Sequence, residues 1–318
     1  MGCGPYRYVS RANGSNIVLE AFDEYYGGAP QIKSLTFKVI PDTTTTAIAL
    51  STGEVNFAEI DSSNLVMLES NPAVVIAEAP TSGFTFISMN HEKEPFNNVD
   101  FRKAVNYAID REEIVEICYE GKAEVNSNIC AKTRFGYSDD QPQYGYDKDK
   151  AVELLEKAGI TTPYDLGTIL VAEKYQNLAV VIKQELEAVG LMTEIRTEEF
   201  NTYIGSLTSG DYDLCALEMT LEGDTQQLSL AFTTDWINMA NNARYSDEEM
   251  DDLWAKAAVE NDTDKREEIF DQIFTKAQDE AIYTVICNPV TLYAYSEGLS
   301  VPEFVLEGYY YVNQFQWQ

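Results

Sequence analysis

The sequence contains one histidine and few basic residues, with 22 Lys and Arg against 53 Asp and Glu. A single histidine excludes histidine-rich metal sites, and any Ser-His-Asp triad would depend on it alone. His91 lies in the stretch "MNHEKEPF", which favours a surface loop residue over a catalytic base. The net charge of −31 predicts a surface that repels phosphates, so nucleic acid and anionic membranes are poor partners.

The cysteines are scattered and never occur as CxxC, which argues against a disulfide framework and a zinc site. They are Cys3, Cys118, Cys130, Cys215 and Cys287. We expect most of them to be buried as small apolar side chains. No run approaches the roughly 18 apolar residues of a membrane-spanning helix. The GxSxG, Walker and GxGxxG motifs are also absent from the sequence.

Two acidic stretches lack the glycine that a calcium-binding EF-hand loop needs at its sixth position. Val152 occupies this position in "DKDKAVELLEKA", and Arg266 occupies it in "NDTDKREEIFDQ". The first stretch is better explained as the start of a helix, and we expect no metal or cofactor. The acids Glu222 and Asp224 leave open an acidic hydrolase, because paired carboxylates perform glycosidase chemistry.

Hydrophobic residues make up 45% of the sequence and aromatic residues 12%, which indicates a globular protein. Asn13-Gly14, between two runs rich in Val, Ile and Tyr, predicts a β-hairpin. In the middle of the chain strands alternate with helices, for which Asn98, Asp110 and Ser246 are expected N-caps. Short connections between these elements predict an open α/β sheet, inserted between β-rich ends.

Several stretches, taken in order, resemble the extracytoplasmic solute-binding proteins of ABC importers, in the dipeptide, oligopeptide and nickel class. "GCGPYRYV" is similar to the family's "GTGPY" segment, with Cys3 in the usual Thr position. "FISMNHEKEPFNNVDFRKAVNYAIDREEIV" is the most specific match. "YDKDKAVELLEKAGI", "VIKQELEAVGL", "GDYDLCALEMT" and "NNARYSDEEMDDL" follow in family order, so the resemblance covers essentially the whole chain.

The resemblance implies an α/β fold of the periplasmic-binding-protein type, class II, whose lobes close over a ligand and perform no chemistry on it. A discontinuous β-rich lobe is expected at 1–85 plus 288–318, and a continuous α/β lobe at 86–287. In the family the "GTGPY" segment follows a signal sequence, part of the discontinuous lobe and a small domain, so we expect this chain to be a fragment. Missing strands would leave the β-rich lobe with an exposed edge or apolar face.

The resemblance also suggests ligand contacts. In the family an acid three residues after a Trp pairs with the peptide ammonium, and in "MTLEGDTQ" Met219 takes the Trp position. Glu222 takes the acid position and Asp224 is a second candidate, although both also fit as ordinary loop acids. Dipeptide-specific members use an Arg near the start of a helix, where this chain has Gln176 or Asn177. The missing cation favours a longer peptide over a dipeptide.

Asn90, Trp236 and Tyr245 are further candidates for the wall of the cleft, with ordinary packing as the alternative. The resemblance implies that the intact protein is a monomer that captures peptides and delivers them to an ABC permease. It would act outside the cytoplasm, in the periplasm or lipid-anchored, with export directed by a signal outside these residues. Two alternatives stay open: the acidic hydrolase, and a diverged binding or sensor module for a non-peptide solute.

Overall fold

The computed structural model describes residues 2–81, 83–132, 134–220, 224–302 and 310–318. The chain divides into two compact units: unit 1 is residues 1–81 with 290–318, and unit 2 is residues 82–289. These boundaries lie a few residues from those expected for the two lobes. The identification of the units with the lobes of a binding protein remains a prediction.

Unit 1 begins with a three-stranded antiparallel sheet in the order β1-β2-β3. Its strands are β1 (Tyr6–Ala12), β2 (Asn16–Ala21) and β3 (Ser34–Lys38). The predicted hairpin joins β1 to β2, and Gly14 takes the positive φ of +68° that such a turn requires. No residue of these three strands is fully buried, although five of the six residues of β2 are half-buried, so the rest of the described chain covers this sheet only in part.

The rest of unit 1 packs two helices against a second sheet. Its elements are α1 (Thr43–Ser51), β4 (Phe57–Ile60), η1 (Ser62–Asn64), α2 (Leu65–Glu69), β5 (Val74–Pro80), the second part of β11 (Tyr283–Ser296), β12 (Leu299–Ser300), η6 (Val312–Gln314) and β13 (Gln316–Trp317). Strands β4 and β5 both pair with β11 in antiparallel register. Leu50, Leu68, Leu292 and Ala294 belong to the small core between these elements.

Unit 2 is built on a mixed sheet in the order β11-β6-β10-β8-β9. Its strands are β6 (Phe84–Met89), β7 (Ala123–Val125), β8 (Tyr164–Ala172), β9 (Leu191–Glu198), β10 (Leu214–Met219) and the first part of β11. Strands β8, β9 and β10 are parallel, whereas β6 runs antiparallel to β10 and β11. All six residues of β6 are buried, as expected for a central strand covered on both faces.

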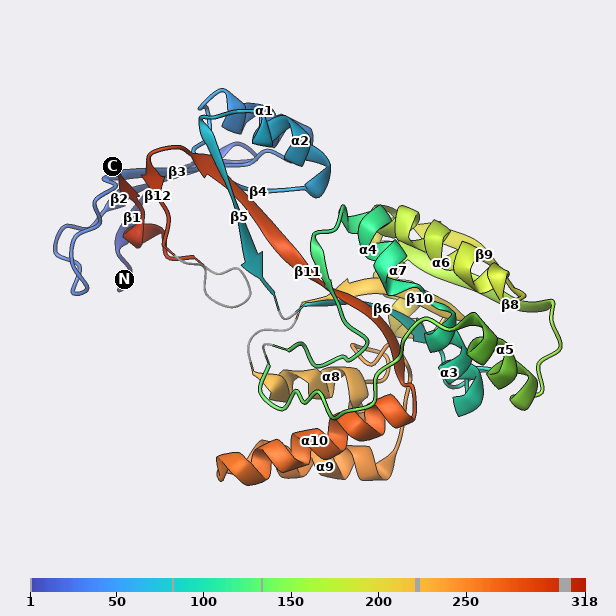
Figure 1. Cartoon of the computed structure of the whole chain (residues 1–318). Coiled ribbons are helices and arrows are strands. Elements are labelled where there is room, and N and C mark those ends of the chain that lie inside the picture. The colour runs from blue at the N-terminus through green and yellow to red at the C-terminus, as the bar shows by residue number, and fades with distance from the viewer. Residues whose placement is uncertain (1, 82, 133, 221–223, 303–309) are drawn as a thin grey trace. The chain divides into compact units, whose positions relative to one another are not determined.

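Helices cover both faces of this sheet (Figure 1). They are α3 (Val99–Ala108), α4 (Arg111–Tyr119), α5 (Lys148–Lys157), η2 (Glu173–Tyr175), α6 (Gln176–Ala188), α7 (Phe200–Ser209), η3 (Thr225–Leu228), α8 (Ser229–Phe232), η4 (Thr234–Trp236), α9 (Glu248–Val259) and α10 (Thr263–Asp279). Alternate strand residues enter different cores: Phe86 packs with the α7–α10 side, and Ile87 with the α3–α6 side. This is the α/β layering that the sequence predicts.

Local signals fixed most helix starts. Asn98 and Asp110 cap α3 and α4 as predicted, because their side chains accept hydrogen bonds from first-turn backbone N–H groups. The predicted cap Ser246 is wrong. Asp247 is the N-cap of α9 and accepts a bond of 2.8 Å from the backbone N–H of Met250, while the Ser246 hydroxyl lies 2.9 Å from that of Thr234.

The cysteines carry no disulfide. Cys130, Cys215 and Cys287 are buried in unit 2, Cys118 is half-buried there, and Cys3 is exposed in unit 1. In the part of the chain that the structure describes, none of the helices has both the length and the apolar character needed to cross a membrane.

Candidate functional site

The parallel strands of unit 2 end together at one edge of the sheet, here called the carboxyl edge. It is formed by the ends of β8 at Ala172, β9 at Glu198 and β10 at Met219, together with the start of antiparallel β6 at Phe84. In open α/β sheets ligands bind outside the carboxyl ends of the strands. This edge is therefore the candidate ligand site of unit 2.

Gln176 and Asn177 lie at the carboxyl edge. They open α6, which follows β8 through the short η2 helix, and both side chains are exposed. The preceding Tyr175 makes no side-chain capping bond, and the backbone N–H of Gln176 donates to the Glu173 carbonyl of the η2 turn. The two exposed amide side chains offer donors to a carbonyl or carboxylate group.

Two charged residues at this edge were not predicted from the sequence. Lys174 is exposed, and its Nζ lies 4.4 Å from the centroid of the Tyr175 ring. Glu218 immediately precedes Met219 at the end of β10, and its carboxylate contributes to the raised pKa of Tyr175, for which burial is the main cause. The available signal was position, because both residues stand where a parallel strand ends.

Asp224 has its carboxylate already engaged. One oxygen accepts a bond of 3.0 Å from the backbone N–H of Gln226, as the N-cap of η3, and lies 3.6 Å from Arg266 Nη2. Its backbone carbonyl accepts a bond from Arg134. Glu222, the leading candidate for the ammonium partner, lies outside the described residues. Only Asp224 of the carboxylate pair on which a hydrolase would depend therefore lies within the described residues.

The remaining candidates lie at the opposite edge of the sheet. Asn90 follows the end of β6, beside the start of β10, and its amide donates to the carbonyls of Gly210 and Tyr212 at 3.2 Å. Tyr245 is buried in the core on the α7–α10 side. Trp236 is half-buried in η4, and its carbonyl accepts three turn hydrogen bonds in the same loop. The structure does not bring these residues together with Gln176 and Asn177.

His91 lies in a turn, as the sequence predicts, but it is half-buried and not a surface residue. Its ring packs edge-on against Tyr245, with centroids 5.8 Å apart, and its Nε2 lies 3.3 Å from the Ile282 carbonyl oxygen. Burial, with Arg102 nearby, lowers the pKa of His91 to about 3. The imidazole is therefore neutral at physiological pH and has a structural role.

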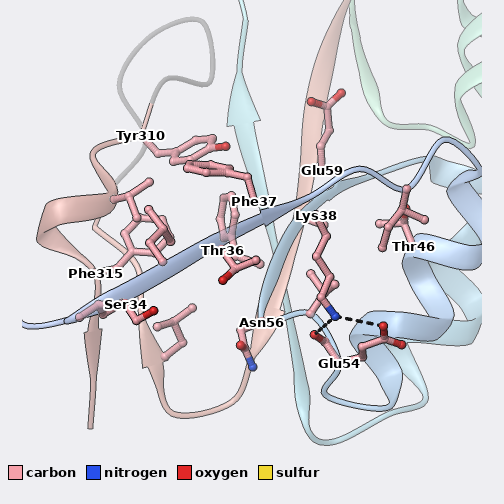
Figure 2. Close-up of a pocket in the computed structure, with 18 of the residues that line it drawn as sticks. Ser34, Thr36, Phe37, Lys38, Thr46, Glu54, Asn56, Glu59, Tyr310 and Phe315 are labelled. Atoms are coloured by element: carbon pink, nitrogen blue, oxygen red, sulfur yellow. Dashed lines mark hydrogen bonds and ion pairs between the residues drawn. The ribbon is translucent and has the colours of Figure 1, made fainter. Parts of the chain in front are cut away.

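Unit 1 contains a groove of about 490 Å³, here called the β3 groove (Figure 2). It is lined by every residue of β3, by Glu54–Glu59, and by aromatic residues near the C-terminus, among them Tyr310, Phe315 and Trp317. Lys38 reaches across one end, with Nζ 3.0 Å from a Glu54 carboxylate oxygen. The lining includes two acidic residues, Glu54 and Glu59, and Glu54 is paired with Lys38.

No group of three or more His, Cys, Asp or Glu side chains is placed to hold a metal ion among the described residues. With the single histidine half-buried and neutral, the described part of the chain contains no arrangement typical of acid–base or metal catalysis. At the carboxyl edge it contains the exposed polar side chains of Lys174, Gln176 and Asn177.

Comparison with known proteins identifies the family. Residues 1–238 of the 318 match the profile described as bacterial extracellular solute-binding proteins, family 5 Middle. The chain belongs to this family.

Two curated relatives of this family 5 protein are similar over nearly its whole length. The dipeptide-binding protein of Escherichia coli is 26% identical over 91% of the chain, and the oligopeptide-binding protein AppA of Bacillus subtilis is 25% identical over 98%. The chain spans 56% and 59% of their respective lengths.

The fold of the family 5 protein is that of the periplasmic binding proteins, as predicted. The ABC transporter substrate-binding protein CtaP of Listeria monocytogenes superposes with a TM-score of 0.92 at 23% identity. The superposition covers 99% of this chain and 67% of CtaP.

Proposed function

We propose that this chain is part of the substrate-binding component of an ABC importer, and that it captures peptides without performing chemistry on them. Membership of the extracellular solute-binding family carries this proposal. The polar carboxyl edge of unit 2 supports it, because it offers donors and acceptors on a rigid sheet but no catalytic group. Peptide binders of this kind hold the peptide backbone through hydrogen bonds and leave its side chains roomy pockets.

Within this proposal, Gln176 and Asn177 bind peptide backbone groups, and the ammonium partner is Glu222. An oligopeptide is favoured over a dipeptide. A dipeptide has its carboxylate at a fixed short distance from its ammonium, which an Arg recognises in a planar, two-bonded geometry. The cation at this edge is instead Lys174, an exposed point charge resting on a tyrosine ring, which does not impose such geometry.

The same proposal covers the setting of the protein. The intact protein would act outside the cytoplasm as a monomer, and it would deliver its peptide to membrane permease subunits. Asn90, Tyr245 and Trp236 are assigned structural roles, because their polar groups or rings are used within unit 2.

Thermal unfolding in the presence of peptides tests the function. Tetra- to nonapeptides at 1,000 times their Kd would stabilise the folded protein by about 4 kcal/mol, whereas dipeptides would bind more weakly. The double substitution of Gln176 and Asn177 by Ala is expected to weaken binding by about tenfold, as expected for loss of one or two hydrogen bonds. Gln272→Ala, at an exposed amide on α10, is the matched control and should leave binding unchanged.

Absence of a shift with every peptide length would count against the peptide class. A preference for dipeptides that is abolished by Lys174→Ala would reverse the length assignment and leave the binding function intact.

A further inference from the structure

Glu185 lies on the buried side of α6 with no hydrogen-bond partner for its carboxyl group. The residue is only 6% exposed, and neither of its side-chain oxygens forms a hydrogen bond with the described chain. A buried carboxylate without a partner is costly, because water no longer solvates its charge. Glu185 therefore holds a proton in this arrangement.

Arg111, at the start of α4, is buried beside Glu185 with its guanidinium bonded elsewhere. Its Nε donates to the Val285 carbonyl at 2.7 Å, and its two Nη atoms donate to the Asn106 carbonyl at 3.1 Å and side-chain oxygen at 3.0 Å. These acceptors are all neutral. Burial lowers the pKa of Arg111 to about 10, and Glu185 is the charge that opposes this effect most strongly.

The charged and titratable groups that act on Glu185 come from α4, from its cap and from the start of α5. They are Asp110, Arg111, Glu113, Cys118 and Lys148. Burial is the main cause that raises the pKa of Glu185 to about 8. The nearby backbone N–H of Asp110 lowers this pKa without forming a hydrogen bond, the acids Asp110 and Glu113 raise it, and Arg111 lowers it. Lys148 is exposed, so Arg111 is the buried cation that can compensate an ionised Glu185.

The bond from Arg111 supports an irregular point of β11. This strand pairs with β6 at Val285 and again at Cys287, so Ile286 is an extra residue in the ladder. Bulges leave ladder groups unpaired, and a side-chain donor to the Val285 carbonyl helps to fix the strand there. Beyond Pro289, β11 continues from unit 2 into unit 1, so the bulge lies in a strand that both units share.

We propose that Arg111 is a proton-controlled switch. While Glu185 is protonated, the guanidinium holds the β11 bulge; when Glu185 loses its proton to solvent, the guanidinium turns to the carboxylate and releases the Val285 carbonyl. The physical reason is that bonds between two charged groups are stronger than bonds to a neutral carbonyl, and a buried carboxylate must be paired. Alkaline pH therefore loosens β11 at its bulge. The inference does not depend on which ligand the protein binds.

NMR spectroscopy of the 318-residue chain tests the switch. The carboxyl carbon of Glu185 and the Nε–H group of Arg111 should titrate together as the pH rises through about 8. Over the same range amide exchange at Ile286 and Cys287, corrected for the intrinsic rate, should accelerate by about fivefold, as expected for loss of one hydrogen bond. The amides of β10 serve as internal references and should change little.

Three variants separate the switch from other titrations. Glu185→Gln keeps the shape of the side chain but stays neutral, so the Arg111 signal should not titrate and exchange in β11 should not accelerate. Glu187→Gln, at a half-exposed carboxylate on the same helix, is the matched control and should titrate like the unsubstituted chain. Cys118→Ser removes the thiol that acts on Glu185 and should leave the midpoint near pH 8. Circular dichroism checks that all three fold.

Three results would overturn the proposal. Ionisation of Glu185 below about pH 6 would mean that its carboxylate already has a partner. Titration of Glu185 without any change at Arg111, together with faster exchange throughout α4, would mean that the charge is hydrated by local opening instead. An Arg111 signal that still titrates in Glu185→Gln would assign the change to another group.

Discussion

Strands β6 and β3 differ in how far the described chain buries them. β6 buries all six of its residues beneath helices on both faces, whereas none of the five residues of β3 is buried. The helices over β6 follow it within the same continuous stretch, so unit 2 carries its own cover. The three-stranded sheet has strand-forming sequence and a good turn, yet none of its residues is fully buried in the described chain. A regular sheet can thus be specified locally without a core.

The largest test of this difference is a pair of Phe truncations. Phe86→Ala should lower the free energy of unfolding by about 3–5 kcal/mol, because it leaves a cavity beside Tyr283, whose ring centroid is 5.1 Å away. Phe37→Ala should cost less than about 1 kcal/mol, since its ring is 43% exposed. Urea unfolding followed by circular dichroism measures the first change, and amide exchange in β2 and β3 measures the second. Equal losses would contradict the comparison.

The next test concerns a buried acid that has no counterpart in the three-stranded sheet. Glu185 on α6 is only 6% exposed, and burial raises its pKa to about 8 from the ordinary value of 4.5. The folded state therefore holds this proton more tightly than the unfolded state. The associated stability is present below about pH 4.5 and is lost as the pH rises through about 8.

Glu185→Gln should remove this loss, which we expect to be on the order of 2 kcal/mol between pH 5 and pH 9. Unfolding midpoints measured across this pH range provide the check. Glu187→Gln on the same helix, at a half-exposed carboxylate, is the control and should leave the slope unchanged. Parallel pH profiles for Glu185→Gln and the unsubstituted chain would mean that Glu185 is not the titrating group.

A smaller effect is expected where the two units are alike. Asp42 caps α1 in unit 1 and Asp147 caps α5 in unit 2, through bonds of 2.7 and 2.9 Å to backbone N–H groups, and both are exposed. Substitution of either by Ala should cost about 1 kcal/mol. Local amide exchange in α1 and α5 is the readout. A much larger cost in unit 2 alone would show that cap energies also depend on the surrounding core.

The smallest effect is expected on the open sheet itself. Tyr8 on β1 is 66% exposed, so Tyr8→Ser should change the stability of the 318-residue chain by no more than about 0.5 kcal/mol. Amide exchange across the β1–β2 hairpin measures this change. A loss above about 2 kcal/mol would reveal that β1 is covered.

Patterns of short range were predicted well from the sequence. The Asn13-Gly14 hairpin and the caps at Asn98 and Asp110 depend on residues within one turn of each other, and all three are confirmed. The cap of α9 was misplaced by one residue, because Ser246 and Asp247 are both good caps and only the backbone conformation selects between them.

Which candidate residues lie at the same edge of the sheet was not predictable from the sequence, because the sequence does not show strand direction. Asn90 ends a strand, as Met219 does, and periodicity does not tell which way a strand runs. β6 is antiparallel to β10, so the two residues lie at opposite edges of the sheet. The turn at His91 was predicted but its partial burial was not, because loop composition does not show which side chain packs over a turn, here Tyr245. Lys174 and Glu218 belong to no recognisable sequence motif, so the sequence did not predict them.

The positions of the cysteines allow unfolding of unit 2 to be followed by thiol alkylation, without any added label. Cys3 is the one cysteine of unit 1 and is exposed, whereas Cys130, Cys215 and Cys287 are buried in unit 2, where burial raises the pKa of each thiol. Only the thiolate reacts with alkylating reagents, so these three cysteines do not react while unit 2 is folded. Once Cys3 and the half-buried Cys118 have been blocked, the rate of alkylation measures how often unit 2 unfolds far enough to expose its buried thiols.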